Sequence, residues 1–516
     1  MSSPQVTRVS EPARNPPLYQ VNTRAWLAGL SNDLGRAATL DDVPDTVLDG
    51  LAETGFDLVY FLGVWQTGAA GRAVSRSNPE WREEFLRVLP DLSEDDICGS
   101  CFAVTGYEVS AALGGDEALE HLRGRLNQRG LKLILDFVPN HTAPDHPWIR
   151  QHPEYYVRGT DDDLAHEPKN YCRVGTPVGL NAAAAAPGAA TEQGGVVLAY
   201  GRDPYFDGWP DTLQLNYGNP ALQEAMLVEL SRVADRCDGV RCDMAMLVLP
   251  EVFERTWGIA AEPFWPGAIA RIKATRPGFL FMAEVYWDLE WELQQQGFDF
   301  TYDKRLYDRL IEGNVLQVRD HLRADMDFQQ RSARFLENHD EPRAASTFGP
   351  ARHRAAAVIT FLCPGLRFFH HGQLEGAKLR LPVHLCRLPV EPVDEELRGF
   401  YLSLLGCLRS PAARDGDWCL LDCRPAWEGN WTHDCFVAQA WQGDEGGRLL
   451  AVVNFADHQS QCHVPLPFAG LAGGRWILRD MLSEISYERE GDGLAAAGLY
   501  LDMPAWGYHV FEVTLS

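Results

Sequence analysis

Four short segments of this chain place carboxylic acids and imidazoles directly after runs of apolar residues. They are residues 135–141 (LDFVPNH), 239–243 (GVRCD), 283–287 (AEVYW) and 337–340 (ENHD). A carboxylate is costly to bury unless it is paired or hydrogen-bonded, so acids at the ends of buried strands indicate a site that uses them. In parallel α/β barrels the active site lies at the C-terminal ends of the strands. The segments therefore predict one acid-lined site at one end of a barrel.

Two carboxyl groups on neighbouring strands can cleave a glycosidic bond with retention of configuration. This route needs an ionised nucleophile and a protonated acid, about 5–5.5 Å apart across the bond. Adjacent parallel strands lie about 4.7–4.9 Å apart, which suits that requirement. Any one of these acids alone would be read as a helix cap or a surface acid, but their common position at strand ends favours the catalytic interpretation.

The neighbours of three acids indicate different roles for them. Arg241 precedes Asp243 by two residues and shares its face of the strand, so its charge should keep Asp243 ionised. Glu284 is followed by apolar and aromatic residues, and such a setting raises a carboxylic pKa, as a general acid requires. Asp340, beside His339, is placed to offset the positive charge of an oxocarbenium-like transition state.

Strand-like and helix-like stretches alternate along most of the chain, a pattern typical of a parallel α/β fold. The candidate strands are 19–27, 58–63, 131–137, 239–242, 279–283, 298–302, 333–336 and 366–370. The stretches 116–129 and 220–236 carry apolar residues at helical spacing. Eight such units predict a closed (β/α)8 TIM barrel formed by residues 1–141 and 213–414.

Two regions depart from this pattern. Residues 142–212 are too long for a structureless loop, so they are predicted to form a small inserted subdomain B after the third strand. Its alanine-rich run 182–190 is expected to be a loop. Residues 415–516 predict a C-terminal all-β sandwich, with short strands at 435–441, 449–454, 461–465, 476–479 and 509–513. Trp427 and Trp431 in this domain are expected to pack in its core, with an accessory sugar site as the alternative.

The amino-acid composition limits the kinds of binding partner and the cellular compartment that we expect. The chain has 46 basic and 72 acidic residues and a net charge of -26. Such a balance disfavours nucleic-acid or membrane-surface binding, whereas a neutral substrate is compatible with it. No window is apolar enough to span a bilayer. Residues 1–17 contain no apolar signal region, and twelve cysteines then predict reduced thiols in the cytoplasm. Cys98 and Cys101 form a lone CxxC, interpreted as loop thiols rather than metal ligands.

The four segments resemble the four motif regions of glycoside hydrolase family 13, the α-amylase superfamily. Residues 136–141, 239–243, 284–287 and 338–340 resemble the first to fourth regions in turn, and residues 214–216 resemble an accessory motif. The inserted subdomain and the β-rich tail match the three-domain plan of the family. The resemblance implies an enzyme acting on α-glucosidic bonds.

The resemblance also implies a role for each site residue. Asp243 would be the nucleophile, Glu284 the acid/base and Asp340 the stabiliser of the transition state. Further residues would bind the sugar in the cleavage subsite or support those that do, and these are Asp136, His141, Arg241, His339 and Tyr107. Tyr107 falls where the family places an aromatic residue that stacks on this sugar. Trp287, close to Glu284, is a candidate stacking platform.

Three positions depart from the family pattern. Many α-amylases carry Lys-His after the nucleophile where this chain has Met246 and Leu247, which argues against a calcium site of that type. Asn140 matches one usual calcium ligand, but calcium takes six to eight oxygens. No metal or other cofactor is therefore firmly expected. Val104 replaces the acid that exo-acting α-glucosidases often carry three residues before the stacking tyrosine, which weakens a simple α-glucosidase interpretation.

The leading hypothesis is a retaining hydrolase of maltooligosaccharides or related α-glucans. The first alternative is an α-glucosyl transferase or isomerase acting on small α-glucosides, because the same motifs serve both reactions. The second is a non-catalytic carbohydrate-binding protein, which predicts loss of a carboxylate, whereas Asp243, Glu284 and Asp340 are all present. Substrate length, linkage preference and oligomeric state do not follow from the sequence.

Overall fold

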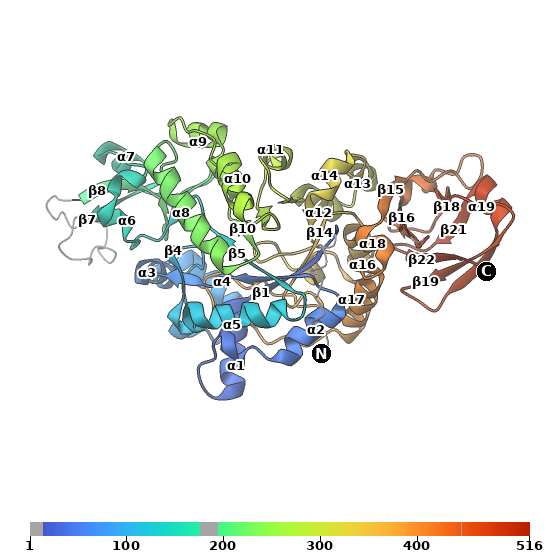
Figure 1. The fold of residues 1–516 in the computed structure, drawn as a ribbon, viewed down its shortest axis with the longest axis horizontal. Coiled ribbons are helices and arrows are strands. Elements are labelled where there is room, and N and C mark those ends of the chain that lie inside the picture. The colour runs from blue at the N-terminus through green and yellow to red at the C-terminus, as the bar shows by residue number, and fades with distance from the viewer. Residues whose placement is uncertain (1–13, 176–194, 445) are drawn as a thin grey trace, which may run out of the picture.

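Eight parallel strands form a closed barrel at the centre of the protein (Figure 1). The computed structural model describes residues 14–175, 195–444 and 446–516. In the order of the chain, the barrel strands are β1 (Pro17–Asn22), β2 (Leu58–Leu62), β5 (Lys132–Phe137), β10 (Gly239–Cys242), β11 (Leu280–Ala283), β12 (Phe300–Tyr302), β13 (Ser332–Arg334) and β14 (Leu366–His370). Each pairs in parallel with its neighbours, and β1 closes the ring against β14. The predicted TIM barrel is confirmed.

The barrel strands are apolar because helices and loops cover them outside and side chains fill them inside. Every residue of β2 and β14 is buried, as expected for strands without a solvent face. The surrounding helices are α1 (Thr23–Leu34), α2 (Asp45–Thr54), α3 (Ala69–Ser77), α4 (Pro79–Val88), α5 (Gly115–Asn127), α8 (Pro220–Arg236), α9 (Pro250–Trp257), α10 (Trp265–Thr275), α11 (Glu290–Gln295), α12 (Lys304–Glu312), α13 (Val315–Leu322), α14 (Met326–Gln330), α15 (Ala344–Thr347), α16 (Pro350–Phe361), α17 (Glu395–Leu408) and α18 (Pro411–Asp415). Among the described residues, none of these helices combines the length and apolarity that a bilayer crossing demands.

The register of β5, β10 and β11 determines which side chains meet. Arg241 of β10 lies beside Asp136 of β5 and Met282 of β11, and Cys242 lies beside Ala283. Asp243 and Glu284 therefore occupy the next level of the barrel, directly beyond the ends of neighbouring strands. The alternation of a strand places Arg241 and Asp243 on one face.

Among the barrel strands, two predicted C-terminal ends are wrong by two or more residues. The first strand was expected over 19–27 but ends at Asn22, and α1 begins at Thr23 because Trp26, Leu27 and Leu30 have helical spacing. The seventh was expected over 333–336 but ends at Arg334. Residues 335–339 therefore separate it from Asp340, which lies on a loop rather than at a strand end.

The segment between β5 and α8 folds back on itself. It contains β6 (His141–Thr142), α6 (Trp148–Gln151), α7 (Asp161–His166), β7 (Tyr171–Gly175), β8 (Gly195–Ala199) and β9 (Leu213–Gln214). β7 pairs antiparallel with β8, and β6 pairs with β9 at the base, so both ends of the segment meet at the barrel. Two further short strands, β3 (Trp65–Thr67) and β4 (Val104–Val109), pair beside it. The alanine-rich run 182–190 lies outside the described residues.

The C-terminal part is an antiparallel β domain, as predicted. Its larger sheet has the order β15 (Asp417–Leu421), β16 (Phe436–Gln442), β17 (Arg448–Asn454), β22 (Tyr508–Leu515), β19 (Arg475–Asp480) and β20 (Ser486–Glu490). A second sheet pairs β18 (Ser460–Val464) with β21 (Leu499–Met503), and α19 (Gly491–Ala497) precedes β21. The sequence pattern missed β15, β20 and β21. Gln439 and Trp441 donate to Ile359 O and Leu362 O at the end of α16, which joins the domain to the barrel.

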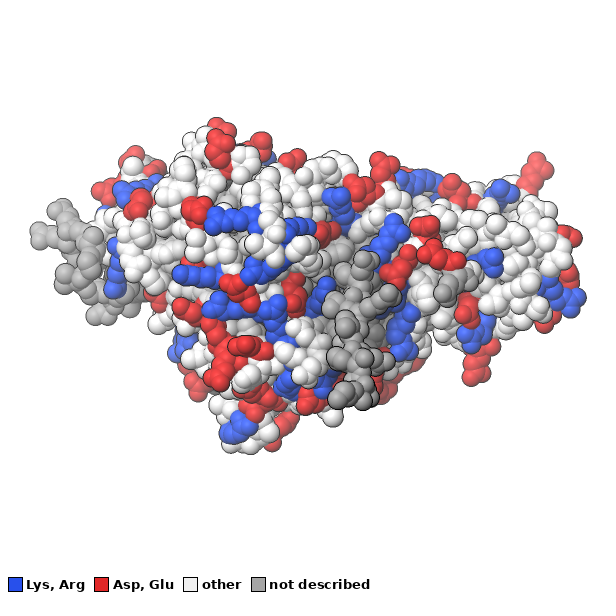
Figure 2. Space-filling view, viewed as in Figure 1, with Lys and Arg blue, Asp and Glu red and all other residues white. Residues whose placement is uncertain are grey.

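Charged side chains of both signs lie side by side across the face drawn in Figure 2. Exposed ion pairs of the protein include Arg323 with Asp320 at 2.8 Å and Arg271 with Glu224 at 3.0 Å. Exposed pairs of this kind contribute little to stability, about 0–1 kcal/mol each. The face drawn in Figure 2 therefore has no broad region of one charge sign.

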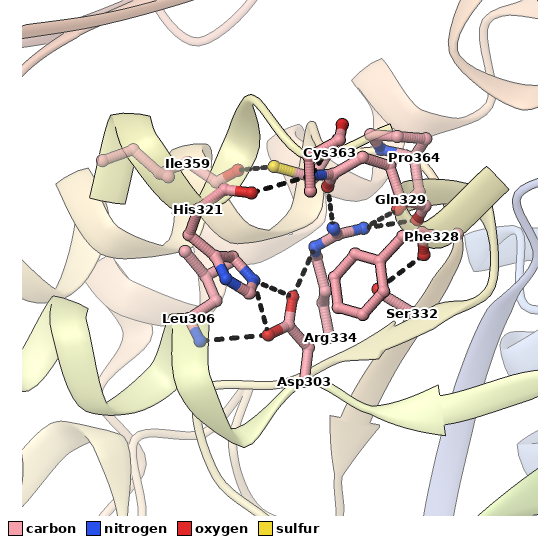
Figure 3. Close-up of polar contacts among 12 residues, drawn as sticks. Asp303, Leu306, His321, Phe328, Gln329, Ser332, Arg334, Ile359, Cys363 and Pro364 are labelled. Carbon is pink, nitrogen blue, oxygen red and sulfur yellow. Dashed lines mark hydrogen bonds and ion pairs between the residues drawn. The ribbon is translucent and has the colours of Figure 1, made fainter. Parts of the chain in front are cut away.

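A buried charge cluster fastens β12 and β13 to the helices outside them (Figure 3). The carboxylate of Asp303 caps α12 by accepting from Leu306 N at 3.0 Å, and it contacts His321 Nε2 at 2.8 Å and Arg334 Nε at 3.1 Å. Arg334 also donates to Gln329 O at 3.0 Å and to Pro364 O. Burial alone would raise the pKa of Asp303, but His321 and Arg334 overcome it and hold the pKa at about 2.

Arg334→Met is expected to lower the free energy of unfolding by about 3–5 kcal/mol, because it removes one of the two basic partners of the buried Asp303 carboxylate and leaves Gln329 O and Pro364 O without their donor. Since the folded pKa of Asp303 lies below the ordinary value, this stabilisation is present above about pH 4 and is lost as the pH falls toward 2. Urea unfolding at pH 7 and pH 3 measures both effects. Arg398→Met, on the exposed side of α17, is the control. A variant at position 334 as stable as the wild type would contradict the prediction.

Candidate active site

Arg241 is the centre of a cluster of carboxylates at the C-terminal ends of the barrel strands. Its guanidinium is fully buried, with Nη1 2.6 Å from Asp243 Oδ1 and Nη2 2.7 Å from Glu284 Oε2. Asp136 lies 3.8 Å away and Asp340 4.0 Å away. Asp243 N donates to Phe137 O and Glu284 N to Cys242 O, so both acids continue the hydrogen-bond ladders of their strands. The structure thus brings the four predicted acids together around one cation.

The ion pair between Arg241 and Asp243 forms as the spacing of two residues predicts. Its effect on the pKa is smaller than expected from the sequence. Burial raises the pKa of Asp243 above its ordinary value, and Arg241 only opposes this shift. Burial therefore outweighs Arg241 in the direction of this shift, because the site is almost closed to water.

Glu284 has the surroundings of a general acid. Burial raises the pKa of Glu284 to about 7, and Arg241 opposes that rise. Tyr286 OH donates to Oε1 at 2.9 Å and Met244 N donates to Oε2 at 2.7 Å. Met244 has a positive φ of 43°, an uncommon conformation for a side chain of this size. The left-handed residue after Asp243 thus aims its N–H at Glu284, a contact that the sequence does not signal.

Asp340 differs from the other two acids in its exposure. Its side chain is 40% exposed, compared with 6% for Asp243 and 3% for Glu284. Gln20 Nε2 lies 2.9 Å from His339 Nδ1, so His339 presents Nε2–H to Asp340 Oδ2 at 3.0 Å. Burial alone would raise the pKa of Asp340, but His339 overcomes it and lowers the pKa to about 2. Asp340 is therefore an ionised carboxylate at the open side of the cluster.

The side chains of His141 and Asp136 differ in whether a ligand can reach them. Burial lowers the pKa of His141 to about 4, so the ring is neutral at pH 7. Among the described residues His141 Nε2 has no hydrogen-bond partner, which leaves it available to a ligand hydroxyl. The carboxylate of Asp136 accepts from Tyr60 OH and, at 2.8 Å, from Gly63 N, so it is closed in beneath Arg241. His141 can contact a substrate, whereas Asp136 supports Arg241.

Tyr107 is not arranged to stack on a sugar. Its ring packs against Phe137 and Trp65, at 5.6 and 5.5 Å between ring centres. Its hydroxyl donates to Val138 O at 3.0 Å and accepts from Val138 N at 2.9 Å. The aromatic ring beside the acids is instead Phe102, which lies 5.0 Å from the guanidinium of Arg241 and 5.4 Å from the ring of His339. The sequence analysis missed Phe102, although Phe102 and Tyr107 share one apolar stretch.

On maltotriose, a substrate of the class that the motif resemblance implies, Phe102→Ala is expected to lower kcat/KM about tenfold, because the ring beside Arg241 and His339 would be lost as a stacking contact for a sugar. Phe102→Tyr should keep most of the activity. Tyr107→Phe is the matched comparison: it should leave kcat/KM within about twofold but lower the free energy of unfolding by about 1–3 kcal/mol, since Val138 loses both hydrogen bonds. Unchanged kinetics in Phe102→Ala would contradict the placement.

Trp287 follows Glu284 by three residues and is partly exposed. Its ring meets that of Tyr205 at 4.9 Å and nearly at a right angle. Trp287 and Asp288 both have positive φ, 67° and 63°, and Asp288 is held by an ion pair with Arg305. Consecutive left-handed side-chain residues are strained and gather at functional sites. Tyr205, which comes from the inserted segment and is 59% exposed, is the aromatic partner of Trp287, and the sequence analysis did not identify it.

The oxygens of Asn140 are engaged within the protein. Its Oδ1 accepts from Gln214 Nε2 at 2.9 Å and its backbone oxygen from Leu215 N at 3.1 Å. Met246 and Leu247 are buried and apolar. In the ranges 14–175, 195–444 and 446–516, no group of three or more His, Cys, Asp or Glu is placed to hold a metal ion. The residues near Asn140 therefore do not fit a calcium site, and Asn140 ties the inserted segment to the barrel.

Comparisons with known proteins agree with this geometry. A model of the α-amylase catalytic domain matches residues 104–379. α-Amylase 3 from Dictyoglomus thermophilum is 22% identical over 316 residues, 56% of this chain and 56% of its own length. An α-1,4-glucan:maltose-1-phosphate maltosyltransferase from Cereibacter sphaeroides is 33% identical over 149 residues, 27% of this chain and 20% of its own. The match to this chain thus spans about half of the length of the first relative and a fifth of the length of the second.

A similar fold occurs in a solved structure. The maltogenic α-amylase from Thermotoga neapolitana superimposes with a TM-score of 0.68 at 18% identity, covering 98% of this chain and 99% of that one. At this identity the likeness concerns the fold alone. The family model covers more than half of the 516 residues and includes the segments that contain Asp243, Glu284 and Asp340. The chain belongs to the α-amylase family, glycoside hydrolase family 13, as its four motif segments indicate.

Proposed function

We propose that this chain is a retaining glycoside hydrolase that cleaves α-glucosidic bonds in maltooligosaccharides or related α-glucans. The observation that carries the proposal is the convergence of Asp243 and Glu284, from neighbouring strand ends, on the guanidinium of Arg241. Two carboxyl groups held side by side in unlike surroundings suit a double displacement, in which one acid attacks and the other transfers a proton.

In the first step Asp243 attacks the anomeric carbon and Glu284 gives its proton to the departing oxygen. The glycosidic C–O bond breaks as the bond from carbon to Asp243 forms, and the shortened glucan leaves. In the second step Glu284, now a carboxylate, takes a proton from water, and the oxygen of that water displaces Asp243. Both carboxyl groups return to their starting states, and the sugar keeps its configuration.

The protonation states support this division of roles. With a pKa of about 7, Glu284 is partly protonated near neutral pH, and a proton on it relieves repulsion between the two acids. The short contact of Arg241 with Asp243 favours the charged form of Asp243 in that state. The ionised Asp340 at the open side would attract the positive charge that develops on the sugar ring.

Transfer to a sugar acceptor is the second candidate, because one covalent intermediate serves both reactions. The observation that favours it is the aromatic pair of Trp287, three residues after Glu284, and Tyr205, which is 59% exposed. The departing sugar leaves on the side of the acid, so an acceptor would enter there and stack on these rings. Some relatives of this chain are named maltosyltransferases, and others are named α-amylases.

Product analysis separates the two reactions. The enzyme is incubated with maltose, maltotriose or sucrose, and reducing ends and product lengths are followed over time. Hydrolysis releases one new reducing end for each bond broken in a maltooligosaccharide. Longer or isomeric products without net release of reducing ends would overturn the hydrolase proposal in favour of transfer. Binding of these sugars without any turnover would leave only a carbohydrate-binding protein.

A further inference from the structure

Two tryptophans of the C-terminal domain lie on its surface rather than in its core. Trp427 is 54% exposed and Trp431 is 65% exposed, both in the connection between β15 and β16. The expectation that they pack in the core is therefore wrong. The core of this domain is formed without them, by residues such as Phe436, Leu450 and Phe511. Two exposed indoles close together in one loop are uncommon, because tryptophan is on average highly buried.

The loop that carries the tryptophans is held in place by a buried asparagine. Asn430 Oδ1 accepts from Ala426 N at 3.1 Å, and Asn430 Nδ2 donates to Thr432 Oγ1 at 2.8 Å. Asn430 N also donates to Trp427 O at 3.1 Å. These bonds order the backbone on both sides of the two indoles, so little conformational freedom of the loop would be lost on binding a ligand.

The second sheet of the domain supplies a polar surface beside the loop. Along β18 and β21, alternate side chains point into the core, and the others point outward. The outward residues pair across the strands as Gln461 with Asp502 and His463 with Tyr500. Gln461 Nε2 donates to Asp502 Oδ1 at 2.9 Å, and the rings of His463 and Tyr500 lie 5.5 Å apart.

Direct contacts join the loop to this sheet. Gln461 N donates to Thr432 Oγ1 at 3.0 Å, and Arg424 and His463 exchange two backbone hydrogen bonds of 2.8 and 2.9 Å. The ring of His458, just before β18, lies 5.3 Å from that of Trp431. The loop and the outward side of the sheet therefore form one continuous surface. This tryptophan surface comprises Arg424, Trp427, Trp431, His458, Gln461, His463, Tyr500 and Asp502.

The chemistry of the tryptophan surface suits a neutral sugar polymer. Indole and phenol rings pack against the apolar C–H faces of pyranose rings, and amide, imidazole, carboxylate and guanidinium groups bond hydroxyls. The surface carries one arginine and one aspartate, and Glu428 is exposed between the two indoles, so its net charge is small and gives no strong preference for a charged ligand. The β18–β21 sheet and the neighbouring loop belong to the C-terminal domain, separate from the barrel strands that carry the acids (Figure 1).

We propose that the tryptophan surface is a second, non-catalytic binding site for an α-glucan chain, where the choice of glucan rests on the proposed function. A glucan bound to this surface stays close to the active site of the same molecule. Its binding to the active site is then intramolecular and has a higher effective concentration. The tryptophan surface should therefore lower KM for long or insoluble glucans. It should not change KM for short oligosaccharides, since they cannot occupy both sites at once.

Affinity electrophoresis in gels that contain amylopectin tests the site. The full chain carries Asp243→Asn so that the gel is not digested, with and without Trp427→Ala/Trp431→Ala. The pair of substitutions is expected to raise the dissociation constant from amylopectin about tenfold, the loss of two stacking contacts. Ile485→Ala, at an exposed turn of the same domain, is the control and should migrate like its parent. Trp431→Phe alone, which keeps a ring, should retain most of the binding.

Kinetics in the otherwise unchanged enzyme separate this inference from the proposed function. Trp427→Ala/Trp431→Ala should leave kcat and KM on maltotriose within about twofold and raise KM on amylopectin severalfold. Equal retention of the parent and the double variant would overturn the inference even if the enzyme is active. So would a fall in molar mass of the double variant by light scattering, since a second copy would then cover the surface. An inactive enzyme whose retention still depends on the tryptophans would refute only the proposed function.

Discussion

Asp243→Asn is expected to reduce kcat on maltotriose by at least about 10⁴-fold, because removal of a nucleophile that acts together with its partners leaves only binding and electrostatic effects. The amide is nearly the same size, so Arg241 Nη1 keeps an oxygen acceptor in the position of Asp243 Oδ1. The variant should therefore fold normally and bind substrate. Steady-state kinetics measure the loss of kcat, and thermal unfolding measures whether the variant is folded.

Rescue by azide identifies the role of Asp243 more closely than the loss of activity. In Asp243→Ala, azide can enter the space of the carboxylate and attack an activated α-glucoside from the face of the nucleophile. The product should be β-glucosyl azide, with inverted configuration. Asp162→Asn, an exposed acid of the inserted segment, is the control and should retain wild-type kinetics. Wild-type turnover in Asp243→Asn would show that another group is the nucleophile.

Glu284→Gln is expected to lose about 10²–10⁴-fold in kcat/KM on maltotriose, the range in which general acid catalysis contributes. The loss should be much smaller on 2,4-dinitrophenyl α-glucoside, whose leaving group departs without a proton. The contacts from Tyr286 OH and Met244 N to Glu284 make the side chain well positioned, so the amide should take the same place. Kinetics on the two substrates, with Glu254→Gln as a surface control, measure the difference.

The pH profile follows from the raised pKa of Glu284. The acid must be protonated when the bond breaks, so kcat/KM should fall as the pH rises through about 7. This limb should vanish in Glu284→Gln. In Glu284→Ala, azide should attack the covalent intermediate and give α-glucosyl azide, the opposite configuration to that from Asp243→Ala. A large and equal loss on both substrates would contradict the role of general acid.

The barrel and its acids were accessible from the sequence because they depend on local patterns. Apolar runs that end on acids indicate buried strands, and the spacing of Arg241 and Asp243 places both on one face of a strand. Parallel strands bring their ends to the same edge, so the meeting of Asp136, Asp243 and Glu284 follows once the fold class is known. The position of Asp340 was harder, because it lies on a loop whose path the strand pattern does not determine.

By itself, then, the sequence determined the fold class, the family and the identities of the acids around Arg241. Only the tertiary structure decided the balance between burial and Arg241 that raises the pKa of Asp243, since desolvation sums over every neighbouring atom. It also decided that Phe102 rather than Tyr107 faces the acids, and that Trp427 and Trp431 are exposed. The physical reason is common to the aromatic residues. The sequence does not distinguish an aromatic residue of a core from one of a binding surface, because the packing of distant segments determines which side chains remain exposed.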